Sequence, residues 1–575
     1  MLNLSQRKAV ETTEGPLRIL AGAGTGKTHT LVSRIGYLIE MLKVEPHKIL
    51  ALTFTNKAAR ELNHRLTELK FPGVEACTFH ALAARILRHY WKTDFAILGK
   101  KEQEEVLFGI LYPNEKKELR IILSDLELID FRKPKSSLAP ERMEIILRDY
   151  RAALKKLNAL DFTGLLTKLL DLWEEDEGIL EKCQALFSYI LVDEYQDVNG
   201  PQIQIVQKLA DKHRNLCVVG DPDQTIYSWR GSDPKSLADF PLNYPDCALV
   251  SLTENYRNPP RILKGAEELI GHNPERLPKP LQALALKQGD ISLWKSVSES
   301  EQNETILHLL QNYLGSHDAM HTADILDVKR DEEFLKFGDI AILYRTQAEG
   351  KRIAAELAKR GYPYQLSAPE VFWERKEVME ILMHLDQLRF LESFPEGIKF
   401  SDWMRERIDH YVSLGKFTDS QVTHMHMLVP HAMAYDAQPI QDALFDFLDE
   451  ARTEQDIDNL VESDKINLLT LHSAKGLEFP VTMIVGLEEG NLPGKKMGED
   501  AELLAEERRL LYVGMTRATR DLHLFFCTQK FAEPTFPSRF LEEIGYSNMI
   551  FGKLPETTVR SIHRKEIRKA QMKLF

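Results

Sequence analysis

The segment between residues 18 and 39 constrains the fold more than any other part of the sequence. Arg18 to Ala21 reads as a short apolar strand, a glycine-rich loop follows over 22–26, and Thr28 to Ile39 reads as a helix. Glycines let backbone N–H groups curl around phosphate oxygens, and the start of a helix adds partial positive charge. This order predicts an α/β fold that binds a nucleotide, with Lys27 at the β- and γ-phosphates and Thr28 on Mg²⁺.

Two further apolar strands are followed by polar side chains that suit phosphate chemistry. The strand Tyr189 to Val192 ends at Asp193 and Glu194, and the strand Leu216 to Gly220 precedes Gln224. A carboxylate at a strand end beside a phosphate loop can hold Mg²⁺, and a second one can orient and deprotonate the attacking water. We assign Asp193 to the metal and Glu194 to the water.

The phosphate loop is the first of several motifs that follow one another in a fixed order. After it come DEYQD at 193–197, GDPDQ at 220–224, NYR at 255–257, HSAKGLE at 472–478 and TRA at 516–518. In these motifs the sequence resembles the superfamily 1A DNA helicases of the UvrD/Rep/PcrA family, from Leu2 to about Leu541. The resemblance implies an ATP-dependent enzyme that moves 3′ to 5′ on single-stranded DNA and unwinds duplexes in DNA repair, replication or recombination.

The resemblance implies which residues carry out ATP hydrolysis. Gln224 would sense the γ-phosphate. Arg257 and Arg517 would reach across from a second motor domain and stabilise the charge that develops there. The implied catalytic residues are Lys27, Glu194, Gln224, Arg257 and Arg517.

The same resemblance implies how ATP is held. Gln6 would read the adenine, Tyr256 would stack on it, and Glu478 would contact the ribose or link the nucleotide to the DNA site. His29 stands where relatives usually carry an arginine over the base. The implied ATP-binding residues are Gln6, Ala21, Gly22, Ala23, Gly24, Thr25, Gly26, Lys27, Thr28, His29, Tyr256, Arg257, Glu478 and Arg517.

A DNA-binding surface is also implied. Hydroxyl and amide groups can hold phosphates, and aromatic rings can stack on bases. Two of the aromatic residues, Phe79 and Trp229, could instead be core side chains. The implied DNA-binding residues are Phe54, Thr55, Asn56, Thr78, Phe79, His80, Tyr227, Trp229, Arg230, Arg345, Thr346, His472 and Lys475.

The resemblance further implies two RecA-like parallel-sheet motor domains of the P-loop NTPase class, each with a helical insertion. Larger relatives carry a substantially longer second insertion that swivels and touches duplex DNA, so the shorter insertion of this chain bears on duplex engagement and on regulation. Residues 316–333 are polar and are expected to form an exposed loop. The predicted boundaries are 1–75 and 163–250 for motor domain 1A, 76–162 for helical subdomain 1B, 251–378 and 463–550 for motor domain 2A, 379–462 for a reduced helical subdomain 2B, and 551–575 for a tail.

The last residues, Arg564 to Phe575, are basic and finish with QMKLF. This resembles the Q-x-x-L-F peptide that docks on the bacterial sliding clamp, so Gln571, Leu574 and Phe575 are candidate clamp-binding residues. A solvated basic tail is the alternative. The short second insertion and this peptide leave a second function open, a clamp-associated ATP-hydrolysing factor that displaces proteins from DNA but unwinds duplexes poorly.

Composition bears on partners and compartment. A net charge of −13 by itself argues against nucleic-acid binding, but a binding groove needs only local positive charge. Five cysteines without CxxC spacing argue against a zinc or iron–sulfur site and fit a reducing compartment. The sequence has no apolar run of about 18 residues and no signal-peptide core at its start, so we expect a cytoplasmic protein without a membrane span.

Overall fold

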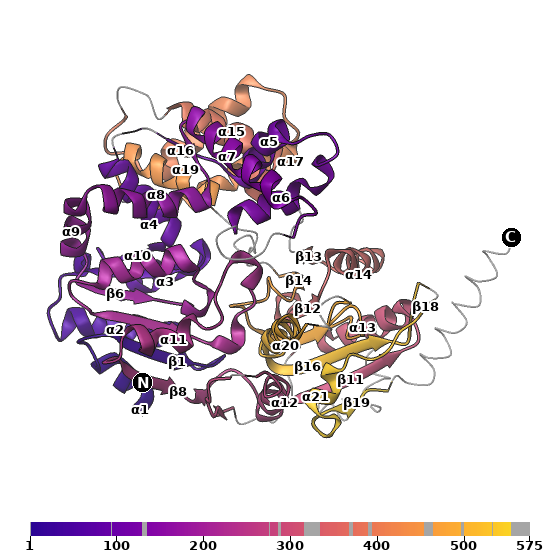
Figure 1. The fold of residues 1–575 in the computed structure, drawn as a ribbon. Helices are drawn as coiled ribbons and strands as arrows, with labels where there is room; N and C mark the ends of the chain where they lie inside the picture. The colour runs from indigo at the N-terminus through magenta and orange to yellow at the C-terminus, as the bar shows by residue number, and fades with distance from the viewer. Residues whose placement is uncertain are drawn as a thin grey trace.

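The computed structural model describes residues 2–553 apart from 92, 94, 129–134, 275, 286–288, 316–333, 367–371, 389–393, 437, 454–463, 496–499 and 532. Two parallel sheets lie side by side, and groups of helices lie above the first of them (Figure 1). The predicted loop at 316–333 and the predicted clamp residues Gln571, Leu574 and Phe575 fall outside the described residues. None of the helices that the structure describes is both long and apolar enough to cross a membrane.

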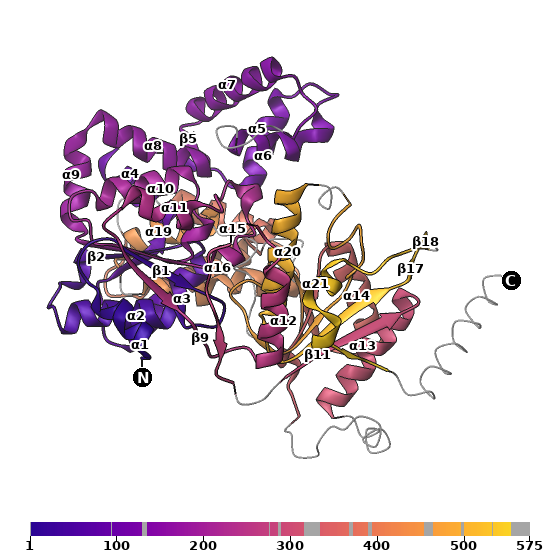
Figure 2. The ribbon, with the colours of Figure 1, turned by 60° about the horizontal axis from the view of Figure 1, so that its bottom comes forward.

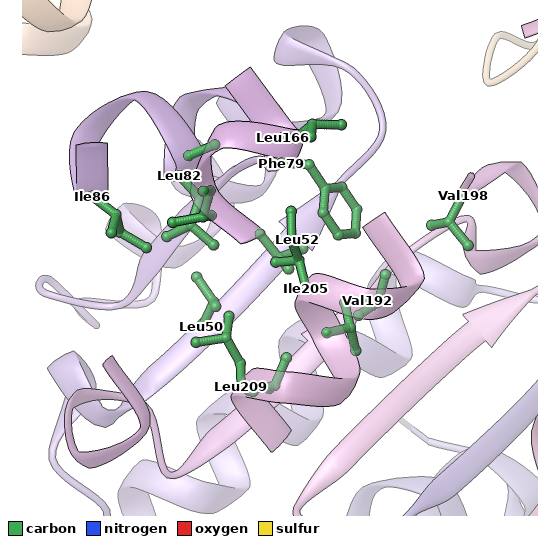
Figure 3. Packing of buried hydrophobic residues seen from close by; sticks show 14 of the residues in the cluster. Leu50, Leu52, Phe79, Leu82, Ile86, Leu166, Val192, Val198, Ile205 and Leu209 are labelled. Atoms are coloured by element: carbon green, nitrogen blue, oxygen red, sulfur yellow. The ribbon is translucent and has the colours of Figure 1, made fainter. Parts of the chain in front are cut away.

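In the described part of the chain, the first sheet has six parallel strands in the order β3-β2-β6-β7-β1-β8. Parallel sheets need cover on both faces. Helices α1, α2 and α3 bury one face, and α4, α8, α9, α10 and α11 bury the other. Figure 3 shows part of the core between the sheet and the helices of this second group, where Leu82 of α4 and Ile205 of α10 lie near Leu52 of β2. We call this sheet and its helices the first domain. Its elements are α1 (Leu4–Glu11), β1 (Leu17–Ala21), α2 (Lys27–Glu40), β2 (Ile49–Thr53), α3 (Asn56–Glu68), β3 (Glu75–Thr78), α4 (Phe79–Tyr90), α8 (Phe162–Glu175), α9 (Glu177–Leu186), β6 (Tyr189–Val192), α10 (Gly200–Ala210), β7 (Leu216–Gly220), α11 (Ser236–Asn243) and β8 (Ala248–Leu252).

The second sheet has seven parallel strands among the described residues, in the order β13-β14-β12-β15-β16-β11-β19. Two cores again lie on its two faces, and we call the sheet with its helices the second domain. Two parallel sheets with helices on both faces confirm the predicted fold class. The elements are β9 (Glu254–Asn255), α12 (Pro260–Ile270), β10 (Gln282–Ala283), β11 (Asp290–Ser296), α13 (Glu299–Leu314), β12 (Ile340–Tyr344), α14 (Gln347–Lys359), β13 (Tyr364–Leu366), β14 (Ile466–Thr470), β15 (Phe479–Ile484), α20 (Ala501–Met515), β16 (Ala518–Cys527), β17 (Gln529–Lys530), β18 (Glu533–Pro534), α21 (Phe540–Ile544) and β19 (Ile550–Phe551).

The first helical insertion is smaller than predicted. Strand β3 hydrogen-bonds to β2, and α4 contributes Leu82 and Leu87 to the core of the first domain, so a boundary at residue 76 cuts through that domain. The amphipathic pattern of α4 predicts a helix but does not say which surface its apolar face covers. The separate core of the insertion comes from α5, α6 and α7. Its elements are β4 (Ala96–Ile97), α5 (Lys100–Ile110), α6 (Leu119–Glu127), α7 (Pro140–Lys156) and β5 (Ala159–Leu160).

The second insertion is a small helical bundle with its own core. In the view of Figure 2, this bundle lies apart from α5, α6 and α7 of the first insertion. Its last helix, α19, lies on α4 of the first domain. Arg88 of α4 donates from Nε and Nη2 to the two carboxylate oxygens of Asp449, both at 2.7 Å. The bundle is thus inserted in the sequence of the second domain, between β13 and β14, but it packs on the first domain. Its helices are α15 (Lys376–Gln387), α16 (Phe400–Leu414), α17 (Asp419–His426), α18 (Leu428–Ala432) and α19 (Ile440–Thr453).

Candidate active site and nucleic-acid interface

The loop between β1 and α2 has the backbone shape that phosphate binding requires. Gly24 and Gly26 have φ values of 68° and 82°, a conformation that residues with a Cβ rarely adopt. Thr25 Oγ1 donates to the Gly22 carbonyl oxygen at 2.9 Å, and α2 begins at Lys27. The loop and the start of the helix therefore fit an anion such as a phosphate chain.

Asp193 and Glu194 follow β6 at its carboxyl end, beside this loop. Lys27 Nζ lies 2.9 Å from Glu194 Oε1. Glu194 has a φ of 49°, a strained backbone that clusters at functional sites. Burial raises the pKa of Asp193, and repulsion from Glu194 adds to the rise. Burial also acts to raise the pKa of Glu194, but Lys27 and Lys475 outweigh it and lower that pKa, so Glu194 is a charged carboxylate at neutral pH.

The oxygen donors on either side of the loop fit a magnesium ion. Mg²⁺ in nucleotide sites commonly takes one or two protein oxygens together with phosphate oxygens and water. Asp193 is half-buried at the end of β6, and Thr28 lies in the first turn of α2. These two residues would hold the ion between the end of β6 and the first turn of α2.

Two arginines of the second domain meet at the same place. A Cβ on Gly24 would lie 2.5 Å from the Cβ of Arg257, so Arg257 lies directly against the phosphate loop. Its Nε donates to Glu478 Oε2 at 2.8 Å. Arg517 is 1% exposed and donates to the carbonyl oxygens of Val513 and Leu477. Burial and the neighbouring Arg257 lower the pKa of Arg517 to about 9.

The residues expected to hold the adenine also lie together. Gln6 is buried, and its Nε2 donates to the Thr25 carbonyl oxygen at 3.1 Å. Asn3, which caps α1, donates to the Tyr256 hydroxyl at 2.9 Å. His29 is exposed on the outer side of α2. The start of the chain and the NYR segment therefore meet beside the phosphate loop.

Residues 221–225, which we call the sensor segment, are held by cations of the second domain. Gln224 Nε2 donates to Asp221 Oδ2 at 2.6 Å. The Lys475 Nζ donates to the Gln224 carbonyl oxygen at 2.8 Å, and Arg509 Nε to that of Thr225 at 2.8 Å. The other cations on this segment are Arg276, which pairs with Asp223, and Lys279, which pairs with Asp221 and Asp223.

The position of Lys475 differs from the prediction that this residue lies on the DNA-binding surface. Its side chain is 8% exposed and forms an ion pair with Asp197, with Glu194 3.9 Å away. In this structure it therefore lies on the carboxylates beside the phosphate loop and not on an open surface. Motif spacing brought Lys475 to the boundary between the domains but did not say which side it faces.

Four of the predicted DNA-binding aromatics form one cluster where the domains meet. The Tyr227 ring stacks on Phe54 with centroids 5.4 Å apart, and it contacts Trp229 at 6.2 Å and His472 at 6.4 Å. Tyr227 is buried, whereas Trp229 is 41% exposed. Exposed aromatic rings beside buried ones can act as a platform for stacked bases. The exposure of Trp229 argues against the alternative of a core tryptophan.

Other predicted DNA-binding residues lie elsewhere or have structural partners. Phe79 is 2% exposed and packs in the first-domain core beside Leu82 and Leu52 (Figure 3), so the core alternative describes it. Arg345 donates to Glu507 at 2.8 Å, and His80 lies edge-on to Phe162. The side chain of Arg230 lies outside what the structure describes. The side chains of Thr55 and Thr78 cap α3 and α4, and the Thr346 hydroxyl donates to Glu349 at the start of α14. Asn56 is buried in the first turn of α3.

Sequence reasoning missed Arg276, Lys279 and Arg509. They stand outside the motifs, and Lys279 is marked only by a proline on either side. A pair of flanking prolines indicates an extended segment but no binding role. Their function becomes visible only when the two domains are packed together.

The comparisons with known proteins agree over most of the chain. Residues 2–245 match the model of the UvrD/REP helicase N-terminal domain, and residues 250–391 and 400–529 match that of the UvrD-like helicase C-terminal domain. Among curated proteins, the ATP-dependent DNA helicase PcrA of Leuconostoc citreum is 31% identical over 95% of this chain and 85% of its own length. The PcrA proteins of Staphylococcus aureus strain Mu50 and Bacillus subtilis strain 168 are 30% and 33% identical over 95% and 91% of this chain, and 86% and 82% of their own lengths.

Proposed function

Because the chain belongs to the UvrD/REP helicase family and is an ATP-dependent DNA helicase, we propose that it moves 3′ to 5′ along single-stranded DNA and opens duplexes at single-strand junctions. DNA would stimulate its ATP hydrolysis. It would act on DNA in the bacterial cytoplasm, in repair, replication or recombination.

The proposed hydrolysis uses groups from both domains. Lys27 would neutralise the phosphates, and Glu194 would accept the proton of the attacking water. Arg257 and Arg517, with the Gln224 amide, would stabilise the charge at the γ-phosphate, which requires the domains to be closed on each other. Asp193 and Thr28 would hold Mg²⁺, which supplies further charge neutralisation at the phosphates when bound.

The contact between the ATP site and the aromatic cluster carries this proposal. Gln224 and Trp229 lie on one short stretch of chain, five residues apart. Lys475 reaches the Gln224 carbonyl oxygen and also lies 5.3 Å from the centre of the Tyr227 ring. A change at the phosphates can thus reach a surface that stacks bases through two contacts. This is the coupling that a nucleotide-driven DNA motor needs.

An unwinding assay tests the proposal directly. Duplexes with a 3′ single-stranded tail, a 5′ tail or a fork are incubated with ATP and the protein, while ATP hydrolysis is measured with and without single-stranded DNA. We expect opening of the 3′-tailed and forked duplexes and stimulated hydrolysis. Opening of the 5′-tailed duplex alone would contradict the proposed polarity, and hydrolysis that ignores DNA would contradict the proposed coupling.

A second candidate function follows from the reduced helical insertion. The alignment with the Leuconostoc citreum relative runs over 654 positions, more than the 575 residues of this chain, so that relative carries segments absent here. A protein with less surface for duplex DNA could hydrolyse ATP and displace bound proteins while it unwinds poorly. Strong stimulated hydrolysis with weak unwinding on the same preparation would favour this function.

The clamp contact belongs to this second candidate. Leu574 and Phe575 would fill an apolar pocket on a bacterial sliding clamp, with Gln571 at its rim. Titration of a fluorescent Arg564–Phe575 peptide with the clamp tests it, and we expect saturable, modest affinity because ordering a short segment costs free energy. Binding that survives replacement of both Leu574 and Phe575 by alanine would identify a nonspecific basic peptide.

A further inference from the structure

Lys279 is buried between two carboxylates of the sensor segment. Its side chain is 1% exposed and forms an ion pair with Asp221, and its Nζ lies 2.8 Å from Asp223 Oδ2. Arg276 Nε donates to the same Asp223 oxygen at 2.8 Å. Lysines are almost never buried to this extent unless they are paired. The ion pairs therefore hold Lys279 and the sensor segment in one arrangement.

Asp221 connects this lysine to the reacting groups. Its Oδ2 accepts a hydrogen bond from Gln224 Nε2 at 2.6 Å, and its N–H donates to Gln196 Oε1 at 2.9 Å. Gln196 in turn donates to Glu194. Lys279 is thus one residue away from the sensor amide and two residues away from the carboxylate proposed to activate water.

The segment that carries Lys279 comes from the second domain and also covers the phosphate loop. It runs from the end of α12 to β10, which pairs with β9. A Cβ on Gly22 would lie 2.7 Å from Leu281 Cδ1, and Asn255 of β9 donates to the Ala23 carbonyl oxygen at 2.7 Å. One strip of the second domain therefore touches both the phosphate loop and the sensor segment.

We infer that Lys279 is a positioning residue, which orients the Gln224 amide through Asp221 and so lets the second domain set the geometry of the γ-phosphate sensor. The inference rests on the proposed function of the same site. A carboxylate that is neutralised on one oxygen offers the other to Gln224 in a fixed direction. Without the cation, two neighbouring buried carboxylates repel each other, and the amide loses its fixed acceptor.

A double-mutant cycle on ATP hydrolysis tests this role. We expect Lys279→Met to lower the DNA-stimulated kcat about tenfold or more, with the KM for ATP changed less than about twofold. Added to Gln224→Ala, the same change should lower kcat no further, because the residue through which it acts is already gone. Lys279→Arg should recover part of the loss. Lys264→Met, on an exposed lysine of α12, is the matched control and should hydrolyse ATP like the wild type.

Binding of nucleotide and of single-stranded DNA provides a second test that does not depend on hydrolysis. Lys279→Met should bind a fluorescent ATP analogue like the wild type but lose the change in single-strand affinity that a non-hydrolysable analogue causes. If Lys279→Met fails to fold, the same change is combined with Asp221→Asn. This double variant replaces the buried ion pair by two neutral side chains of similar size. Equal losses of kcat in the wild-type and Gln224→Ala backgrounds, or normal kcat with a normal nucleotide effect on DNA affinity, would overturn the inference. A wild type without DNA-stimulated hydrolysis would instead refute the proposed function.

Discussion

The lysine and the carboxylate that are proposed to act on ATP are paired with each other in this structure. Lys27 and Glu194 lie 2.9 Å apart, and Gln196 also donates to Glu194. A triphosphate that enters the loop has to draw Lys27 away from this carboxylate. The carboxylate then gains freedom to accept a proton only when phosphates have taken its place beside the lysine.

Glu194→Gln tests the role of this carboxylate. The change keeps the shape of the side chain but removes the charge that can accept a proton from water. We expect ATP turnover to fall roughly 10²–10⁴-fold while a fluorescent ATP analogue still binds. Glu68→Gln, at an exposed position of α3, is the control. Turnover near the wild-type rate would show that another group activates the water.

Arg257→Ala and Arg517→Ala test the charges that come from the second domain. Each should slow DNA-stimulated turnover by about 10³–10⁵-fold, because arginines that stabilise the charge of phosphoryl transfer have this worth in comparable enzymes. Affinity for single-stranded DNA without nucleotide should change little. Arg517 is buried, so its variant also needs a melting curve, and Arg517→Lys is the partner that keeps the charge. Lost DNA binding with unchanged turnover would reverse the roles.

At the scale of residues, the family resemblance implied that Lys27, Glu194, Gln224, Arg257 and Arg517 act together, and their side chains lie close to one another beside the phosphate loop. The resemblance could not predict Lys279 or Arg509, because their contacts arise from packing across the domain boundary. Nor could it separate Lys475 from the DNA surface. A motif indicates roughly where in the fold a side chain lies. The direction in which that side chain points depends on partners that are distant in sequence.

At the scale of elements, strands of the first sheet were predicted directly from the sequence. Parallel strands are buried on both faces and read as continuous apolar runs, as in Ile190 to Val192 and Leu216 to Val219. The helix α4 was placed in the wrong unit, because its apolar face would suit either an insertion or the first sheet. The same ambiguity explains Phe79, whose ring completes the core beneath α4.

The short stretch with Tyr227 and Trp229 gives a prediction for DNA binding. Trp229→Ala removes a partly exposed ring at the edge of the aromatic cluster, so single-strand affinity should fall by roughly 1–3 kcal/mol, the value of one stacked base. Stimulation of ATP hydrolysis by DNA should weaken with it. A fluorescence titration with an oligonucleotide measures the affinity. A folded variant with normal affinity and stimulation would assign Trp229 to packing alone.

At the scale of the whole molecule, the contact between α4 and α19 decides where the second helical bundle sits. The Arg88 and Asp449 side chains are 17% and 9% exposed, and removing the Asp449 carboxylate takes away the acceptor of two Arg88 N–H groups in a largely buried place. We expect Asp449→Ala to destabilise the protein by roughly 3 kcal/mol, measured by denaturant unfolding. Asp402→Ala breaks the exposed pair with Arg405 in the same bundle and should cost less than about 1 kcal/mol. Equal effects would mean that the docked bundle adds little.

This docking has a mechanical consequence. The bundle is held to the second sheet by the chain from β13 to α15 and from α19 to β14, and to the first domain by Arg88. While the ion pair holds, the bundle is a tether that limits how far the two sheets can separate. The stride of the motor would then be bounded by a surface remote from ATP, and loss of one ion pair would lengthen it.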